Sequence, residues 1–137
     1  MKKISSILVL ACLLLVAATS CKKDDKKEDT VLGKWTLVKG DWKQTFNGQV
    51  FTGSETFSAS DVATFNENKT FTWTAGEESM AGTWTQDGNI ITLSAMEDDQ
   101  PVQVEYTIKT LTSTTLIVHS KTVDEAYSYE ATVELKR

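Results

Sequence analysis

The sequence is poor in the residue types that most often carry chemistry. Its 137 residues include two cysteines, one proline and one histidine. Catalysis needs a nucleophile with a base, a pair of carboxylates or a metal site, and the sequence supplies little of each. His119 is out of phase with Leu116 and Val118, so we expect its side chain to face outward rather than to act as a base or ligand. We therefore predict a protein that is not an enzyme and uses no cofactor or metal.

One acidic cluster, Glu97, Asp98 and Asp99, leaves an alternative open. Carboxylate oxygens are the ligands that calcium prefers in proteins. A solvated turn explains three consecutive acids as well, and we favour the turn.

Basic residues are also scarce, because 14 lysines and arginines stand against 19 aspartates and glutamates. Loss of Lys2 and Lys3 with the leader described below would leave 12 basic residues against 19 acidic ones, a net charge of −7. This acidity opposes binding of the domain to nucleic acid or to an anionic membrane surface. We expect no nucleic-acid partner.

The first 20 residues have the order of a signal peptide. Lys2 and Lys3 precede an apolar run over residues 7–18, and small residues follow it. As a helix the run would rise about 18 Å, well short of the ~30 Å hydrocarbon core, so we do not expect a lasting membrane span. The segment Ala18-Thr19-Ser20-Cys21 resembles the bacterial lipobox, whose cysteine receives diacylglycerol. The resemblance implies that residues 1–20 are a lipoprotein leader and that lipid on Cys21 holds the protein to a membrane.

We expect residues 21–30 to be the lipidated cysteine and a charged, flexible tether. The stretch after Cys21 reads KKDDKKED and contains no apolar residue to bury. Because Cys12 would leave with the leader and Cys21 would carry lipid, we expect no disulfide in the mature chain. The lysines and acids directly after the cysteine resemble signals that send lipoproteins to the cell surface in some Gram-negative bacteria. They imply an outer-membrane anchor with the domain exposed at the cell surface, and a periplasm-facing anchor is the alternative.

Residues 31–137 are rich in threonine, valine and aromatic residues, and their polarity alternates with the period of a strand. We predict one all-β domain, an antiparallel up-and-down meander of about eight to ten strands that closes into a barrel, because closure removes free sheet edges. Some of the early strands could merge into a single bent one. The expected strands cover residues 34–39, 41–47, 49–57, 61–66, 70–75, 80–86, 89–96, 102–111, 115–123 and 126–136.

Three stretches of this domain resemble the bacterial lipocalin-like domain family of small exported proteins. They are Gly33-Lys34-Trp35, the pair ATFNENKTFTW and GTWTQDGNIITL over 63–73 and 82–93, and YTIKTLTSTTLIV over 106–118. The resemblance implies a lipocalin-like barrel over residues 31–137, in which Trp35 plugs the closed end and Arg137 stacks on it. The chain is shorter than true lipocalins and lacks their Thr-Asp-Tyr motif and C-terminal helix.

Aromatic side chains are the candidate binding residues. Core packing explains most of them, but a ring of aromatics at a barrel mouth suits an apolar ligand. The residues we nominate for such a pocket are Trp42, Phe71, Trp73, Tyr106 and Tyr127. We predict a monomeric, lipid-anchored, non-enzymatic module that binds a small apolar or amphipathic ligand. The alternative is a protein-interaction or inhibitor module whose barrel is filled by side chains, since a small barrel admits either arrangement.

Overall fold

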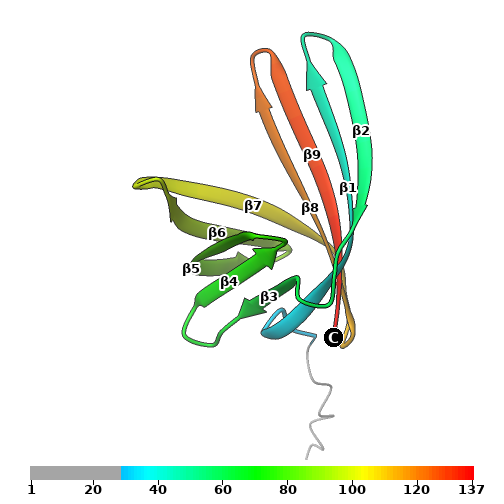
Figure 1. Ribbon diagram of the computed structural model, residues 1–137. Helices are drawn as coiled ribbons and strands as arrows, with labels where there is room; N and C mark the ends of the chain where they lie inside the picture. Colours follow the sequence, from blue (N-terminus) through cyan, green and yellow to red (C-terminus); the bar gives the residue numbers. More distant parts are fainter. Residues whose placement is uncertain (1–28) are drawn as a thin grey trace, which may run out of the picture.

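The computed structural model describes residues 29–137, and every regular element in this part of the chain is a β-strand (Figure 1). The predicted leader, Cys21 and most of the predicted tether lie outside the described residues. The strands are β1 (Gly33–Phe46), β2 (Gln49–Thr56), β3 (Val62–Phe65), β4 (Thr70–Ala75), β5 (Glu78–Asp87), β6 (Ile90–Glu97), β7 (Gln100–Leu111), β8 (Thr115–Asp124) and β9 (Tyr127–Lys136).

The strands form one antiparallel meander that closes on itself. From β3 to β9 each strand pairs with the next along the chain, and β9 then pairs with β1 over 36–46. β1 also pairs with β3 through its first residues, Gly33 to Thr36, so β1 and β3 to β9 close a barrel. β2 lies outside this ring, on the C-terminal half of β1. The predicted all-β barrel is confirmed, with β2 as an additional strand.

The first two predicted strands are a single strand, β1. A bulge between Leu37 and Lys39 bends it, and the buried positions change phase there, from Trp35 and Leu37 before the bulge to Gly40 after it. A bulge adds one residue to a strand and so shifts which side chains face inward. The predicted boundary between residues 39 and 41 lies next to this bulge, and the pairing with β9 continues through it, so the two predicted strands merge into one bent strand.

The seventh strand begins two residues earlier than predicted, at Gln100. Asp98 and Asp99 have φ angles of 48° and 60°, the values of a two-residue type I′ hairpin turn. Pro101 therefore lies within β7, opposite Met96. The pair next to the turn, Glu97 and Gln100, is the hydrogen-bonded one in such a hairpin, so the ring nitrogen of Pro101 points to the free edge of β7 and no ladder bond is lost.

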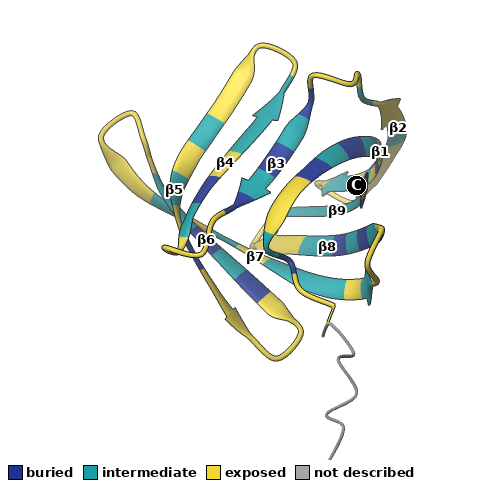
Figure 2. Cartoon of the chain, turned by 90° about the horizontal axis from the view of Figure 1, so that it is seen from below, coloured by how far each residue is buried: buried dark blue, intermediate teal, exposed yellow. Residues whose placement is uncertain are grey.

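The core fills the end of the barrel where the chain enters and leaves. Val31 and Trp35 are buried there beside Leu135 from the last strand, and Figure 2 shows further buried segments on β3, β4, β6 and β8. We call this the closed end. The buried apolar side chains are those of Val31, Trp35, Leu37, Ala63, Phe65, Phe71, Trp84, Ile91, Leu93, Leu116, Val118 and Leu135.

The opposite end of the barrel opens because two strand pairings stop short. β7 pairs with β8 only through 107–111, and β3 pairs with β1 only through 33–36. Beyond these points β2, β1, β9 and β8 continue together as one arm, while β4 to β7 form a second arm that leans away from it (Figure 1). We call the space between the two arms the mouth.

Candidate binding site at the barrel mouth

Trp35 and Arg137 together seal the closed end. The Trp35 indole is fully buried, and its Nε1 donates a 2.7 Å hydrogen bond to the carbonyl of Val31. The guanidinium carbon of Arg137 lies 4.1 Å from the Trp35 ring centroid, a cation–π arrangement. The same guanidinium donates hydrogen bonds to the carbonyl oxygens of Ser113, Leu32 and Thr30. The last residue of the chain thus clamps the segment that leads into β1.

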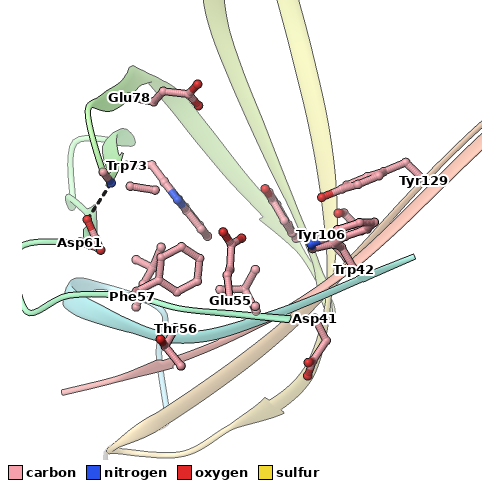
Figure 3. A pocket seen from close by; sticks show the side chains of 17 residues that line it. Asp41, Trp42, Glu55, Thr56, Phe57, Asp61, Trp73, Glu78, Tyr106 and Tyr129 are labelled. Carbon is pink, nitrogen blue, oxygen red and sulfur yellow. Dashed lines mark hydrogen bonds between the residues drawn. The ribbon is translucent and has the colours of Figure 1, made fainter. Parts of the chain in front are cut away.

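A cavity of about 550 Å³ lies between the two arms at the mouth (Figure 3). Small-molecule sites typically enclose about 300–1,000 Å³, so the space is large enough for a ligand of two or three rings. Its lining comes from both arms and from the segment between β2 and β3: Leu37, Gly40, Asp41, Trp42, Glu55, Thr56, Phe57, Asp61, Trp73, Ala75, Gly76, Glu78, Tyr106, Ser120, Tyr129, Ala131 and Val133.

Aromatic rings form the walls of this cavity. Trp73 of β4 stacks on Tyr106 of β7, with 5.6 Å between ring centroids and 8° between ring planes. On the other arm, the indole of Trp42 lies over Gly53, its cross-strand neighbour in β2. A side chain at position 53 would overlap the indole. Glycine at this position therefore leaves the room that the Trp42 ring occupies beside the cavity.

Gly40 leaves the space in which two further lining groups meet. A Cβ atom at position 40 would come within 3.2 Å of both Glu55 Oε1 and Phe57 Cε2. The side chains of Glu55 and Phe57 therefore rest on the backbone of β1. Figure 3 shows the Glu55 carboxylate directed into the space between the aromatic rings.

Asp61 fixes the base of the mouth. Its carboxylate accepts hydrogen bonds from the backbone N–H of Gly76 at 2.8 Å and from the backbone N–H and hydroxyl of Ser58. The bond from Gly76, followed by that from the Ser58 backbone, lowers the pKa of Asp61 below its usual value. Asp61 thereby joins the segment after β2 to the turn between β4 and β5, and its charge is already satisfied.

The tyrosines of the cavity are neutral hydrogen-bonding groups. Burial raises the pKa of the Tyr106 hydroxyl, and the neighbouring Tyr129 adds to the effect. Burial also raises the pKa of Tyr129, with a further contribution from the negative charge of Glu55. Both hydroxyls therefore remain protonated across the neutral pH range.

The structure brings together three of the five nominated pocket residues. Trp42, Trp73 and Tyr106 line the cavity. Phe71 lies deeper, in the closed-end core, with 1 % of its surface exposed. Tyr127 does not line the cavity, because it pairs with Phe46 and Asp124 at the tips of the hairpins, farther out than Tyr129.

The sequence interpretation missed Phe57, Tyr129 and the two glutamates, Glu55 and Glu78. Tyr129 has the same phase as Tyr127 in an alternating strand, so the sequence predicts that both side chains face inward. It does not predict how far along the barrel each one lies. Glu55 lies in a strand without clear alternation, and its inward direction depends on the pairing of β2 with β1.

The other candidate residues lie away from this cavity. His119 is on the outer face of β8, where its Nδ1 lies 3.2 Å from Thr132 Oγ1. Within residues 29–137 no three histidine, cysteine, aspartate or glutamate side chains gather as a metal site, and Glu97, Asp98 and Asp99 serve the hairpin between β6 and β7. Nor does this part of the chain contain a helix long and apolar enough to cross a membrane.

Fold and site together define a class: an antiparallel β-barrel plugged by a tryptophan at one end and hollow at the other, the architecture of a binding module. Residues 31–118 match the family described as lipocalin-like domain, and the chain belongs to this family. Searches of curated proteins and of solved structures returned no match.

Proposed function

We propose that this protein is a lipid-anchored, non-enzymatic binding protein that takes a small apolar or amphipathic ligand between the two arms of the mouth. The observation that carries the proposal is the cavity of about 550 Å³ lined by Trp42, Phe57, Trp73, Tyr106 and Tyr129. Covering large exposed aromatic surfaces with an apolar group removes them from water and is therefore favourable. The alternative of a protein-interaction module with a filled barrel lacks this support, because side chains fill only the closed end.

The binding proposal is tested by a substitution that places a large side chain in the cavity. Ala131 lines the cavity opposite Trp42, so Ala131→Phe places a ring where the ligand would lie. We expect at least a tenfold loss of affinity, equivalent to about 1.4 kcal/mol, for the neutral fluorescent probe N-phenyl-1-naphthylamine. The purified protein is titrated with the probe, and far-ultraviolet circular dichroism checks the fold.

Ser128→Phe is the matched control, because Ser128 is on the same strand but pairs with Thr45 and Val123 on the outer face. Its affinity for the probe should equal that of the wild type. Equal affinities for both phenylalanine variants, or no binding to the wild type, would refute a ligand site at the mouth.

The anchor is the second part of the proposal. We place lipid on Cys21, the protein in the outer membrane and the domain at the cell surface. The described chain begins at the closed end, where Thr30 is bound by Arg137. A lipid attached upstream of this point would be joined to the domain at the closed end, opposite the mouth.

Cys21→Ser should move the protein from the membrane fraction to the soluble fraction and abolish labelling by radioactive palmitate. Cys12→Ser, which changes the other cysteine, should alter neither result. Degradation by protease added to intact cells is the expected result for surface display. A membrane-bound, labelled Cys21→Ser protein would contradict the assignment.

A further inference from the structure

The charges around the mouth are separated by sign. Glu55, Glu78 and Asp61 all line the cavity, whereas none of the lining residues is a lysine, an arginine or a histidine. An adjoining hollow of about 490 Å³ shares Trp73 and Glu78 with the cavity, adds Glu97, and likewise has no basic residue in its lining. The interior of the mouth therefore carries a negative potential.

Two acids on the outer face of β1 and β9 have lysine partners. Lys39 pairs with Asp41 at 3.0 Å, and Lys121 pairs with Glu130 at 2.8 Å. Asp41 is among the residues around the cavity, but its carboxylate is held outside by Lys39 and by the Ser54 hydroxyl. On the arm formed by β1, β2, β8 and β9, lysine side chains therefore neutralise Asp41 and Glu130.

Glu55 and Glu78 have no such partner within the part of the chain that the structure describes. Neither carboxylate makes an ion pair or a side-chain hydrogen bond there. They also come from opposite arms, Glu55 from β2 and Glu78 from β5. A ligand between the arms would therefore lie within reach of both charges.

The aromatic rings complete the chemistry. The face of an indole or phenol ring attracts a cation through its quadrupole, and cages of several rings bind ammonium groups in this way. Trp42, Trp73 and Tyr106 present such rings to the same space as the glutamates. Rings and carboxylates favour the same sign of ligand charge, and both disfavour an anion.

We propose that the ligand of the mouth is an organic cation, an amine or quaternary ammonium group on an aromatic or aliphatic body, held by Glu55 and Glu78 among the aromatic rings. This inference rests on the proposed ligand-binding function and narrows it. Fatty acids and other amphipathic anions are excluded as ligands, because their head groups would meet unpaired carboxylates and no basic partner.

The test uses three ligands that share an indole ring and differ in charge: tryptamine (cation), tryptophol (neutral) and indole-3-propionate (anion). Each is measured with the purified protein at pH 7 by its displacement of N-phenyl-1-naphthylamine. We expect tryptamine to compete at least tenfold better than tryptophol, and indole-3-propionate not to compete. Raising the salt concentration should weaken the binding of tryptamine but not that of tryptophol, because salt screens charge interactions.

Charge-removing variants assign the effect to residues. Glu55→Gln and Glu78→Gln keep the side-chain shape, so each should lower the affinity for tryptamine about threefold or more. The affinity for tryptophol should stay the same. The double variant should bind the two ligands equally. Glu105→Gln is the matched control, since Glu105 is exposed on the outer face of β7 and its loss changes the net charge equally. Its preference for tryptamine should be that of the wild type.

The outcomes separate this inference from the function on which it rests. If the probe binds but the three indoles compete equally, or none of them competes, the cation proposal is wrong and the binding function stands. A preference for tryptamine that survives in the double variant also overturns the proposal, because it would arise elsewhere. If the probe itself does not bind, the proposed function fails.

Discussion

The Trp35→Ala variant is expected to lose about 3–5 kcal/mol of its free energy of unfolding, the typical cost of removing a buried large aromatic side chain. Trp35 has no exposed surface and lies at the centre of the closed end. The substitution leaves a cavity there, removes the hydrogen bond to the Val31 carbonyl, and takes away the ring under Arg137. Single domains are stable by only about 5–15 kcal/mol, so much of the protein should unfold at physiological temperature.

Urea denaturation followed by far-ultraviolet circular dichroism measures this loss. Trp42→Ala is the matched control, because it removes the same side chain at the other end of the same strand. Trp42 is only partly buried and faces the mouth, so we expect it to cost about 1 kcal/mol, roughly half the burial of a large apolar side chain, and to weaken probe binding instead. Equal losses of stability in the two variants would contradict the division into a plugged end and a hollow end.

Strand faces could be predicted from the sequence wherever the alternation is regular. In β7 the residues Val102, Val104, Tyr106 and Ile108 alternate with polar ones, a pattern that predicts one apolar face, and their partners in β6 and β8 place them on the inner face. A period of two fixes a face through local geometry alone. The closure of β9 onto β1 was also expected, because an unclosed meander leaves free edges.

Depth along the barrel could not be predicted in this way. Phe71 and Trp73 share a face at a spacing of two, yet Phe71 is in the core and Trp73 lines the cavity. The difference depends on where the pairings of β3 with β1 and of β7 with β8 stop, which long-range contacts decide. Tyr127 and Tyr129 differ for the same reason.

The negative charge of the cavity could not be predicted from the sequence for a related reason. From the sequence alone the acidic residues are a property of the whole surface, whereas the strand pairings direct Asp41 and Glu130 outward to lysine partners and bring Glu55 and Glu78 to the cavity. Glu78 is an exposed residue that begins β5 directly after a turn, so nothing in the local sequence marks it as part of a site. Only the approach of the two arms brings Glu78 and Glu55 to one cavity.

Gly82→Ala is expected to lower the free energy of unfolding by about 2–3 kcal/mol, the upper part of the usual range for overpacking. Gly82 lies in β5 opposite Ala95 of β6. A Cβ atom there would overlap the carbonyl oxygen of Ser94 and lie 3.0 Å from the Ala95 Cα. Both obstacles are backbone atoms, so relief requires β5 and β6 to separate beside the buried pair of Trp84 and Leu93.

Gly53→Ala is the control that distinguishes a backbone obstacle from a movable one. The three atoms nearest to its Cβ would all belong to the indole of Trp42, a side chain at the edge of an open cavity that has room to turn. We expect a loss of stability below about 1 kcal/mol, together with weaker probe binding because the indole is displaced. Urea midpoints and probe titrations on both variants measure the contrast. Since alanine is ordinarily better than glycine in a strand interior by about 0.5–1 kcal/mol, a Gly82→Ala protein more stable than the wild type would show that β5 and β6 do not approach so closely.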